Sequence, residues 1–211
     1  MERPTGPAAP AADPAADRPV TGPTGTGPAV TRPTGTGPTV TVTADTPERM
    51  RELGRRTAAL LRAGDLVLLS GHLGAGKTTF TRGLGEGLGV RGAVTSPTFV
   101  IARVHPSLRQ GPPLVHVDAY RLGGGLEEME DLDLDVSLPE SVVVVEWGEG
   151  KVEELSEARL QIVVERQLGG ADGDGDAGAG EDGDDPRRVT FTGIGPRWAD
   201  ARLEDLAPEG V

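Results

Sequence analysis

The stretch GHLGAGKT at residues 71–78 directly follows the apolar run DLVLLS at residues 65–70. The apolar run is typical of a buried parallel strand, and the octapeptide matches G-x-x-x-x-G-K-T, the phosphate-binding loop of nucleoside triphosphatases. In such a loop the backbone N–H groups surround the phosphates, and a helix beginning near Lys77 directs the positive end of its dipole at them. This stretch predicts a nucleotide-binding α/β domain.

Lys77 and Thr78 are the side chains of this loop that would carry chemistry. The chain has 21 Lys and Arg residues, of which only Lys77 and Lys151 are lysines, so lysine at this position does not reflect composition. A slim ammonium on a flexible stem can contact two phosphates at once, and the Thr78 hydroxyl would bind Mg²⁺. The alternative is a chance match in a chain with 32 glycines. The strand before the loop and the helix after it argue against chance.

Two segments hold too few apolar residues to join a core. Residues 1–38 are rich in Pro, Gly and Thr, and we expect them to be a disordered tail. Residues 169–185 carry seven acids and no base, and we expect a disordered acidic loop insertion rather than a calcium site. We therefore expect one ATPase domain at residues 39–198, with residues 199–211 as a C-terminal tail.

Composition excludes several classes of function. The absence of cysteine rules out disulfides, thiolate zinc sites and a cysteine nucleophile. No apolar run approaches the length of a membrane span and no export signal is evident, so we expect a cytoplasmic protein with no membrane partner. The formal net charge of −12 argues against this chain binding nucleic acid by itself.

The periodicity of the remaining residues predicts an α/β fold. Strands that alternate with helical stretches imply a mostly parallel sheet flanked by helices, here with a C-terminal antiparallel strand pair that the acidic loop joins. Thr46 and Pro47 give the cap and N-terminal proline signals of a helix. We expect strands at residues 39–43 (at an edge), 65–70, 114–117, 141–145, 159–165 and 188–192.

Two carboxylates follow buried strands. Nucleotide hydrolysis needs a carboxylate near the phosphates to hold Mg²⁺, directly or through water, and open α/β sheets bind ligands at the carboxyl ends of their strands. The run VVVVE ends at Glu146, and the run VHVD ends at Asp118. We favour Glu146 as the metal carboxylate and keep Asp118 as the second candidate. The alternative for each is a solvated acid.

Other polar positions lie near these motifs. The segment TSPTF at residues 95–99 is a proline-stiffened turn, and in triphosphatases a Thr-bearing loop at this place can sense the γ-phosphate. We interpret His72 as a solvated loop residue and His116 as packing beside the sheet, and a catalytic role is the alternative for each. Trp147 could fill the core, as buried aromatic residues usually do.

Four motifs in this order resemble the TsaE (YjeE) family: GHLGAGKTTF (71–80), TSPTF (95–99), HVDAYR (116–121) and VEWGE (145–149). The resemblance covers about residues 43–168. Members of this family are the small ATPase subunit of the bacterial machinery that makes tRNA threonylcarbamoyladenosine. His72 departs from the pattern, because the family usually has an acid there, which puts any side-chain role at this position in doubt.

The resemblance implies a P-loop fold that holds ATP, with Mg²⁺ on Thr78 and Glu146 and with Asp118 near the γ-phosphate. It implies that Trp147 lies by the nucleotide and that Thr46 and Pro47 contact the base. The catalytic candidates are Lys77, Asp118 and Glu146. The cofactor-binding candidates are Thr46, Pro47, Gly74, Ala75, Gly76, Lys77, Thr78, Thr79, Asp118 and Trp147.

The resemblance also implies partners. ATP binding and slow hydrolysis would cycle the contact with two sister subunits, the transferase that modifies the adenosine next to the anticodon and its non-catalytic paralogue. The chain would meet tRNA only indirectly. A small-molecule kinase is one alternative, but residues 148–158 hold no Arg-bearing lid. A nucleotide sensor without turnover is another. A GTPase is disfavoured because the Asn-Lys-x-Asp guanine signature is missing.

Overall fold

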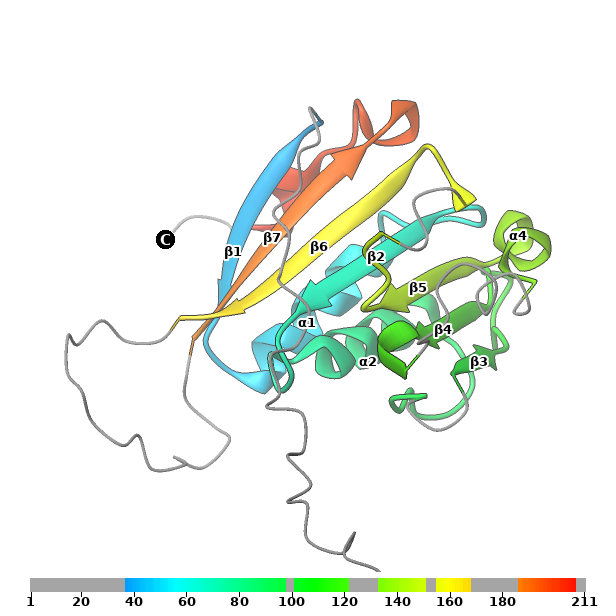
Figure 1. The fold of residues 1–211 in the computed structure, drawn as a ribbon, viewed down its shortest axis with the longest axis horizontal. Helices are drawn as coiled ribbons and strands as arrows, with labels where there is room; N and C mark the ends of the chain where they lie inside the picture. The colour runs from blue at the N-terminus through cyan, green and yellow to red at the C-terminus, as the bar shows by residue number, and fades with distance from the viewer. Residues whose placement is uncertain (1–36, 98–100, 122–132, 151–154, 168–185, 208–211) are drawn as a thin grey trace, which may run out of the picture.

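The computed structural model of the chain describes residues 37–97, 101–121, 133–150, 155–167 and 186–207. The expected acidic loop insertion and all but the last two residues of the expected N-terminal tail lie outside these ranges. Within them the chain forms one seven-stranded sheet with apolar clusters on both faces (Figure 1). In this part of the chain, each helix is too short or too polar to cross a bilayer.

The sheet has the strand order β1-β7-β6-β2-β5-β4-β3. Its centre, β6-β2-β5-β4, is parallel, whereas β1 and β7 on one side and β3 on the other are antiparallel to their neighbours. The predicted α/β fold, its edge strand and its antiparallel pair β6–β7 are thereby confirmed. The strands are β1 (Thr39–Ala44), β2 (Leu66–Gly71), β3 (Ala102–His105), β4 (Leu114–Asp118), β5 (Val142–Glu146), β6 (Arg159–Arg166) and β7 (Arg187–Ile194).

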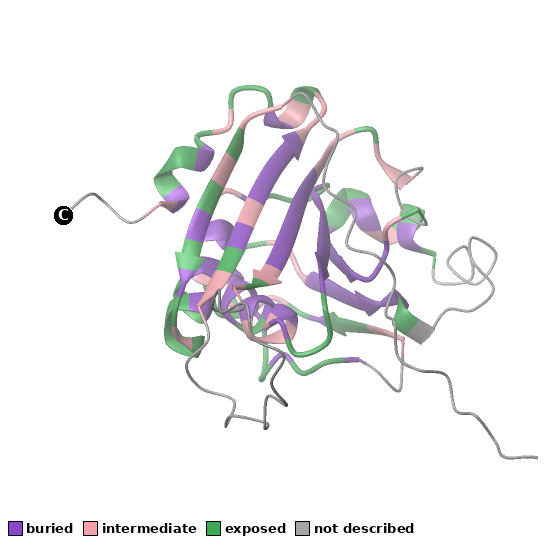
Figure 2. Cartoon of the chain, turned by 60° about the vertical axis from the view of Figure 1, so that its left-hand side comes forward, coloured by how far each residue is buried: buried purple, intermediate pink, exposed green. Residues whose placement is uncertain are grey.

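The three central strands β2, β4 and β5 are buried at every residue, which explains their continuous apolar sequences (Figure 2). The edge strand β1 instead alternates exposed threonines with buried residues toward its end. The other edge strand, β3, was not predicted from the sequence. Its four residues ARVH are partly exposed and carry no apolar run, so sequence patterning has little to detect there.

Helices α1 (Pro47–Ala58) and α2 (Lys77–Leu88) pack against each other on one face of the sheet. Thr46 caps α1 as predicted, since its hydroxyl accepts a hydrogen bond from Arg49 N at 3.2 Å. Glycine at position 83 weakens α2 as an isolated helix, but a Cβ there would overlap the backbone of Arg51 in α1. The glycine therefore permits close contact of the two helices.

The opposite face of the central strands is covered by α4 (Leu134–Ser137) and the 3-10 turn η2 (Leu138–Glu140). Leu134 and Leu138 pack there with alternate residues of β2, β4 and β5. These two short elements were not predicted, because a four-residue helix spans little more than one turn and shows no periodicity in sequence.

The C-terminal residues complete the first face. The 3-10 turns η4 (Pro196–Trp198) and η5 (Leu203–Leu206) follow β7, and Trp198, Leu203 and Leu206 are buried in the same cluster as α1 and α2. Residues 199–207, which we assigned to a tail, thus include an element that packs against the core.

Candidate functional site

The parallel strands bring two carboxylates to one edge of the sheet. In the register of β4 and β5, Asp118 is the direct partner of Glu146, and Glu146 also pairs with Leu69, two residues before the end of β2. The phosphate-loop sequence begins just beyond Leu69. Asp118 and Glu146 are 6% and 3% exposed, so both side chains are enclosed by the protein rather than solvated at the surface.

The loop after β2 leads into α2 with no side-chain cap. Its N-cap is Gly76, which has φ 105°, a left-handed conformation that favours glycine, and no side chain accepts the N–H groups of the first turn there. A long helix with an uncapped N-terminus offers backbone donors and the positive end of its dipole to an anion. The phosphate-binding role of residues 71–78 stays a prediction, and this uncapped N-terminus is the geometry that it requires.

Lys77 is folded back over this loop. Its ammonium donates to Gly71 O at 2.8 Å and His72 O at 3.1 Å, and it lies 3.7 Å from the ring centroid of Trp147. Burial lowers the pKa of the Lys77 ammonium, and the carboxylates of Glu146, Asp118 and Glu149 act in the opposite direction. A cation is thus held among three carboxylates and one aromatic face, at the mouth of the loop.

Glu146 is contacted by two side chains. Its Oε1 atom lies 3.4 Å from the Thr78 hydroxyl, which donates to it, and 2.9 Å from His116 Nε2. The two residues predicted to hold a metal, Thr78 and Glu146, therefore meet although they are 68 positions apart in sequence. His116 was interpreted as packing beside the sheet. It is fully buried there, but it also bonds to the candidate metal carboxylate.

Asp118 has its own set of donors. Ser96, in the proline-stiffened turn, donates its hydroxyl to Asp118 Oδ2 at 3.4 Å, and Tyr120 N donates to Oδ1 at 3.1 Å. Tyr120 belongs to the 3-10 turn η1 (Ala119–Arg121) directly after β4. Thr95, which lies in the proline-stiffened turn with Ser96, accepts a hydrogen bond from Arg103. Residues 98–100 lie outside the described residues.

Trp147 and Tyr120 form an aromatic wall. Their ring centroids are 5.2 Å apart at an interplanar angle of 56°, and Trp147 has φ 62°, an uncommon backbone conformation for a residue with a large side chain. Trp147 is 7% exposed and Tyr120 is 51% exposed. Trp147, which contacts Lys77, is thus buried, whereas Tyr120 is open to solvent.

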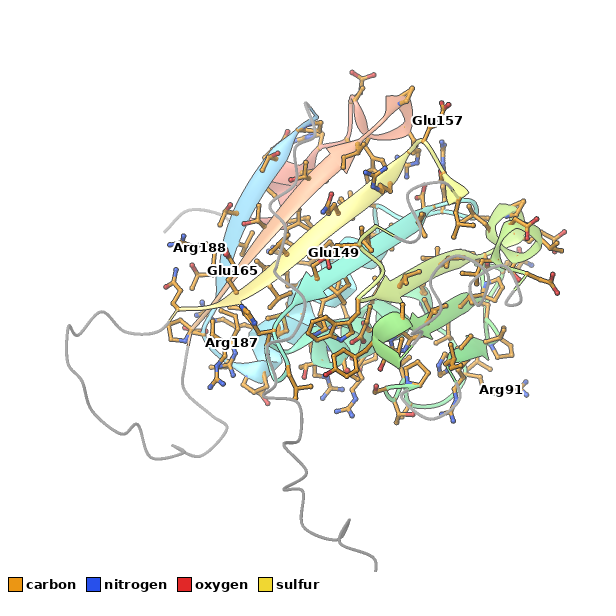
Figure 3. All side chains as sticks on the ribbon, viewed as in Figure 1. Arg91, Glu149, Glu157, Glu165, Arg187 and Arg188 are labelled. Carbon is orange, nitrogen blue, oxygen red and sulfur yellow. The ribbon has the colours of Figure 1, made fainter. Side chains whose placement is uncertain are left out.

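Two adjoining cavities lie over the loop. The larger, about 450 Å³, is lined by loop residues together with Ser96, Asp118, Tyr120, Glu146 and Trp147. The smaller, about 200 Å³, is lined by Thr46, Pro47, Met50 and Arg187 and shares Gly74, Gly76 and Thr79 with the larger. In Figure 3, Arg187 lies at the end of the sheet where β7 begins. A groove of 340 Å³ elsewhere, on the outer strands, holds none of the predicted site residues.

Every residue predicted for the site lines one of the two cavities over the loop. The sequence prediction assigned no individual role to Ser96, Glu149 or Arg187, and for His116 it favoured packing over a catalytic role. Ser96 lies in a turn that the sequence did mark. The contact of His116 with Glu146 could have been suspected from strand alternation, because positions 116 and 118 fall on one face of β4. No sequence signal places Arg187 beside the loop.

A model of the family "Threonylcarbamoyl adenosine biosynthesis protein TsaE" matches residues 44–171. The chain is 71% identical over 158 residues to the tRNA threonylcarbamoyladenosine biosynthesis protein TsaE of Streptomyces coelicolor, a match covering 75% of this chain and 99% of the relative. The protein of the same name from Bacillus subtilis is 41% identical, with coverage of 72% and 84%. That from Mycobacterium tuberculosis is 51% identical, with coverage of 54% and 71%.

The fold is similar to that in the crystal structure of Bacillus subtilis YdiB. The TM-score is 0.57 at 35% sequence identity, and the match covers 80% of this chain and 94% of the other. The Streptomyces coelicolor match includes almost the whole relative and leaves a quarter of this chain unmatched.

Proposed function

The chain belongs to the TsaE family, and from this premise we propose that it binds and hydrolyses ATP as a subunit required for threonylcarbamoyladenosine modification of tRNA. Participation in threonylcarbamoyladenosine biosynthesis is the part that the family itself carries. The ATPase activity rests on one observation. Lys77, Thr78, Asp118 and Glu146 surround a single 450 Å³ cavity at the carboxyl ends of parallel strands.

For ATP binding, the loop amides and Lys77 would hold the phosphates. The ammonium already lies over the loop, so a short rotation of its flexible stem would bring it to the β- and γ-phosphates. Thr46 and Pro47 line the smaller cavity, which adjoins the larger across Gly74 and Gly76, and that cavity would take the base. Trp147 would lie beside the phosphates.

The residues present fit Mg²⁺ as the companion ion. Thr78 Oγ1 and Glu146 Oε1 are oxygen donors 3.4 Å apart, and oxygen is the ligand that Mg²⁺ prefers. Among the described residues no group of three His, Cys, Asp or Glu side chains could hold a metal. An ion here would therefore also need phosphate and water ligands, as Mg²⁺ does in nucleotide sites. When bound, it would neutralise negative charge that develops on the phosphates.

For hydrolysis, we assign Asp118 to the γ-phosphate. Ser96 and Tyr120 N hold its two carboxylate oxygens, so the side chain has a fixed orientation toward the cavity from which it could position the attacking water. Lys77 would stabilise charge on the transferred phosphoryl group from the other side. Among the described residues, two carboxylates and no arginine line the larger cavity together with Lys77, which supports slow turnover.

We further propose that the activity serves a complex of sister subunits, the threonylcarbamoyl transferase and its non-catalytic paralogue, with tRNA contacted only indirectly. The net charge of −12 supports the last point, because tRNA binding relies on clustered cations. Residues 39–198, together with η5, which packs on their core, would form the ATPase domain. A cytoplasmic location fits the modification of tRNA.

Calorimetric titration with ATP, with and without Mg²⁺, followed by single-turnover hydrolysis of γ-labelled ATP, tests the proposal. We expect Mg²⁺-dependent binding and slow release of phosphate that accelerates when the two partner subunits are added. Binding without phosphate release in either condition would instead indicate a nucleotide sensor. The absence of ATP binding would contradict the proposal.

A further inference from the structure

His116 is fully buried in β4, yet its side chain makes one hydrogen bond within the described residues. Nε2 lies 2.9 Å from Glu146 Oε1, and Nδ1 has no hydrogen-bond partner there. Because an ionised carboxylate only accepts hydrogen bonds, Nε2–H is the donor to Glu146. Nδ1 takes no part in this contact.

The unpartnered Nδ1 lowers the stability of the fold. The hydrogen bond between Nε2 and Glu146 therefore points to a role other than stability. A buried ring nitrogen without a partner destabilises the fold, and a leucine or phenylalanine would fill the same space without that cost. His116 pairs in register with Val144 of β5 and Arg103 of β3, and neither pairing requires an imidazole. The hydrogen bond to Glu146 is therefore the distinguishing property of histidine at this position.

We propose that His116 is a positioning residue that fixes the carboxylate of Glu146 for the metal. The inference rests on the proposed function, in which Glu146 holds Mg²⁺ with Thr78. Two donors, His116 Nε2 and Thr78 Oγ1, meet the same oxygen, Oε1, so rotation of the carboxylate is restricted before any ligand arrives. Partners of this kind orient metal-binding side chains, and their loss costs roughly 10–100-fold in metal affinity or activity.

The second carboxylate of the site has donors other than His116. Asp118 is held by Ser96 and by Tyr120 N, from a turn and from the backbone after β4. Loss of the His116 donor should therefore change the metal dependence of nucleotide binding and leave the geometry at Asp118 in place. This separation gives the inference a signature that general damage to the core would not reproduce.

The test uses two pairs of variants in the full chain. His116→Gln keeps an amide N–H at about the reach of Nε2, whereas the shorter His116→Asn cannot extend to Glu146. His116→Phe removes the donor and keeps the ring volume, and His105→Phe is its matched control. His105 is also a buried imidazole with an unpartnered Nε2, but its hydrogen bond goes to the backbone of Arg91 rather than to a carboxylate of the site.

ATP affinity is measured by calorimetry across Mg²⁺ concentrations, and unfolding is followed by circular dichroism. We expect His116→Phe and His116→Asn to lose at least about tenfold of the Mg²⁺-dependent gain in affinity. His116→Gln should remain within about threefold of the original protein, and His105→Phe should not change the gain. The double variant Glu146→Gln, His116→Phe should match Glu146→Gln alone, because both changes act through one carboxylate.

Equal Mg²⁺ dependence in His116→Asn and His116→Gln would overturn the inference, and so would full additivity in the double variant. If His116→Phe does not fold, the comparison of Gln with Asn decides. These failures differ from a failure of the proposed function, in which the unaltered protein itself would show no Mg²⁺-dependent ATP binding.

Discussion

At the scale of single residues, Lys77 couples the loop to the rest of the site. Its ammonium is held by two carbonyl oxygens of its own loop and by the face of Trp147, and it lies within the field of three carboxylates. These contacts keep a buried cation satisfied without a phosphate. A bound triphosphate would replace these contacts to neutral carbonyls with contacts between opposite charges, which are stronger.

Replacing Lys77 with alanine should weaken ATP binding while leaving the sheet folded. A hydrogen bond to a charged group contributes roughly 1.5–3 kcal/mol, so we expect affinity to fall by at least about tenfold in calorimetric titration. His72→Ala is the control, because His72 lies in the same loop with its side chain exposed. Unchanged affinity in Lys77→Ala would contradict the assignment of the phosphate loop.

Two variants, Glu146→Gln and Asp118→Asn, should separate the binding of Mg²⁺ from the action at the γ-phosphate. Glu146→Gln keeps the shape of the side chain but loses the charge that would hold Mg²⁺, so we expect weaker Mg²⁺ dependence and hydrolysis slower by at least about tenfold, roughly 1.4 kcal/mol of barrier. Asp118→Asn should also slow hydrolysis, with less effect on Mg²⁺ dependence.

Hydrolysis rates of both variants against Mg²⁺ concentration, in the complex with the partner subunits, make the comparison. If Asp118→Asn alone loses its response to Mg²⁺, the two assignments are reversed. The sequence could indicate both acids because each ends a buried strand. It could not rank them by contact, since the donors to Glu146 come from α2 and β4 and only the folded sheet brings these elements together.

At the scale of elements, the sequence predicted what long apolar patterns encode. The central strands and both long helices were expected, and β6 and β7 were matched as antiparallel partners across the acidic loop. Strand β3 and helix α4 were missed, because four residues carry too little pattern. Gly83 and Gly87 of α2 face α1 closely, a reason for glycine that the sequence of α2 alone does not reveal.

Gly83→Ala tests whether glycine is needed at this position for the close contact of α1 and α2. Helix propensity alone would make the change stabilising by about 1 kcal/mol. A Cβ at position 83 would overlap the backbone of Arg51, and backbone cannot rotate away as a side chain can, so we expect destabilisation of about 1–3 kcal/mol instead. Chemical denaturation gives the sign directly. A more stable variant would show that α1 and α2 separate at little cost.

At the scale of the whole molecule, the domain extends beyond the part that the family model matches. That match ends at residue 171, but β7 lies inside the sheet between β1 and β6, and Trp198, Leu203 and Leu206 are buried in the core. The sequence pattern predicted β7. It did not predict η5, because two leucines in an acidic segment resemble a solvated tail. The phosphate-loop strand therefore depends on residues far along the chain.

Arg197 provides the clearest link of this kind. Its guanidinium binds both oxygens of Asp65 at 2.9 and 2.8 Å and also donates to Leu60 O at 2.8 Å. Asp65 directly precedes β2 and is 3% exposed, so its carboxylate has little access to water. Without Arg197, the buried carboxylate of Asp65 would keep one hydrogen-bond donor among the described residues, the backbone N–H of Arg62.

We expect Arg197→Met to destabilise the protein by about 3 kcal/mol in chemical denaturation, because breaking one side of a buried ion pair strands the other charge. Arg49→Met is the matched control. Arg49 pairs with Asp45 at 3.1 Å, but both side chains are at least half exposed, and such pairs contribute about 0–1 kcal/mol. Asp65 lies at the end of β2 remote from the phosphate loop, so ATP affinity of the folded variant should be unchanged. Equal stability losses in the two variants would contradict the role of the C-terminal residues in anchoring the strand that carries the loop.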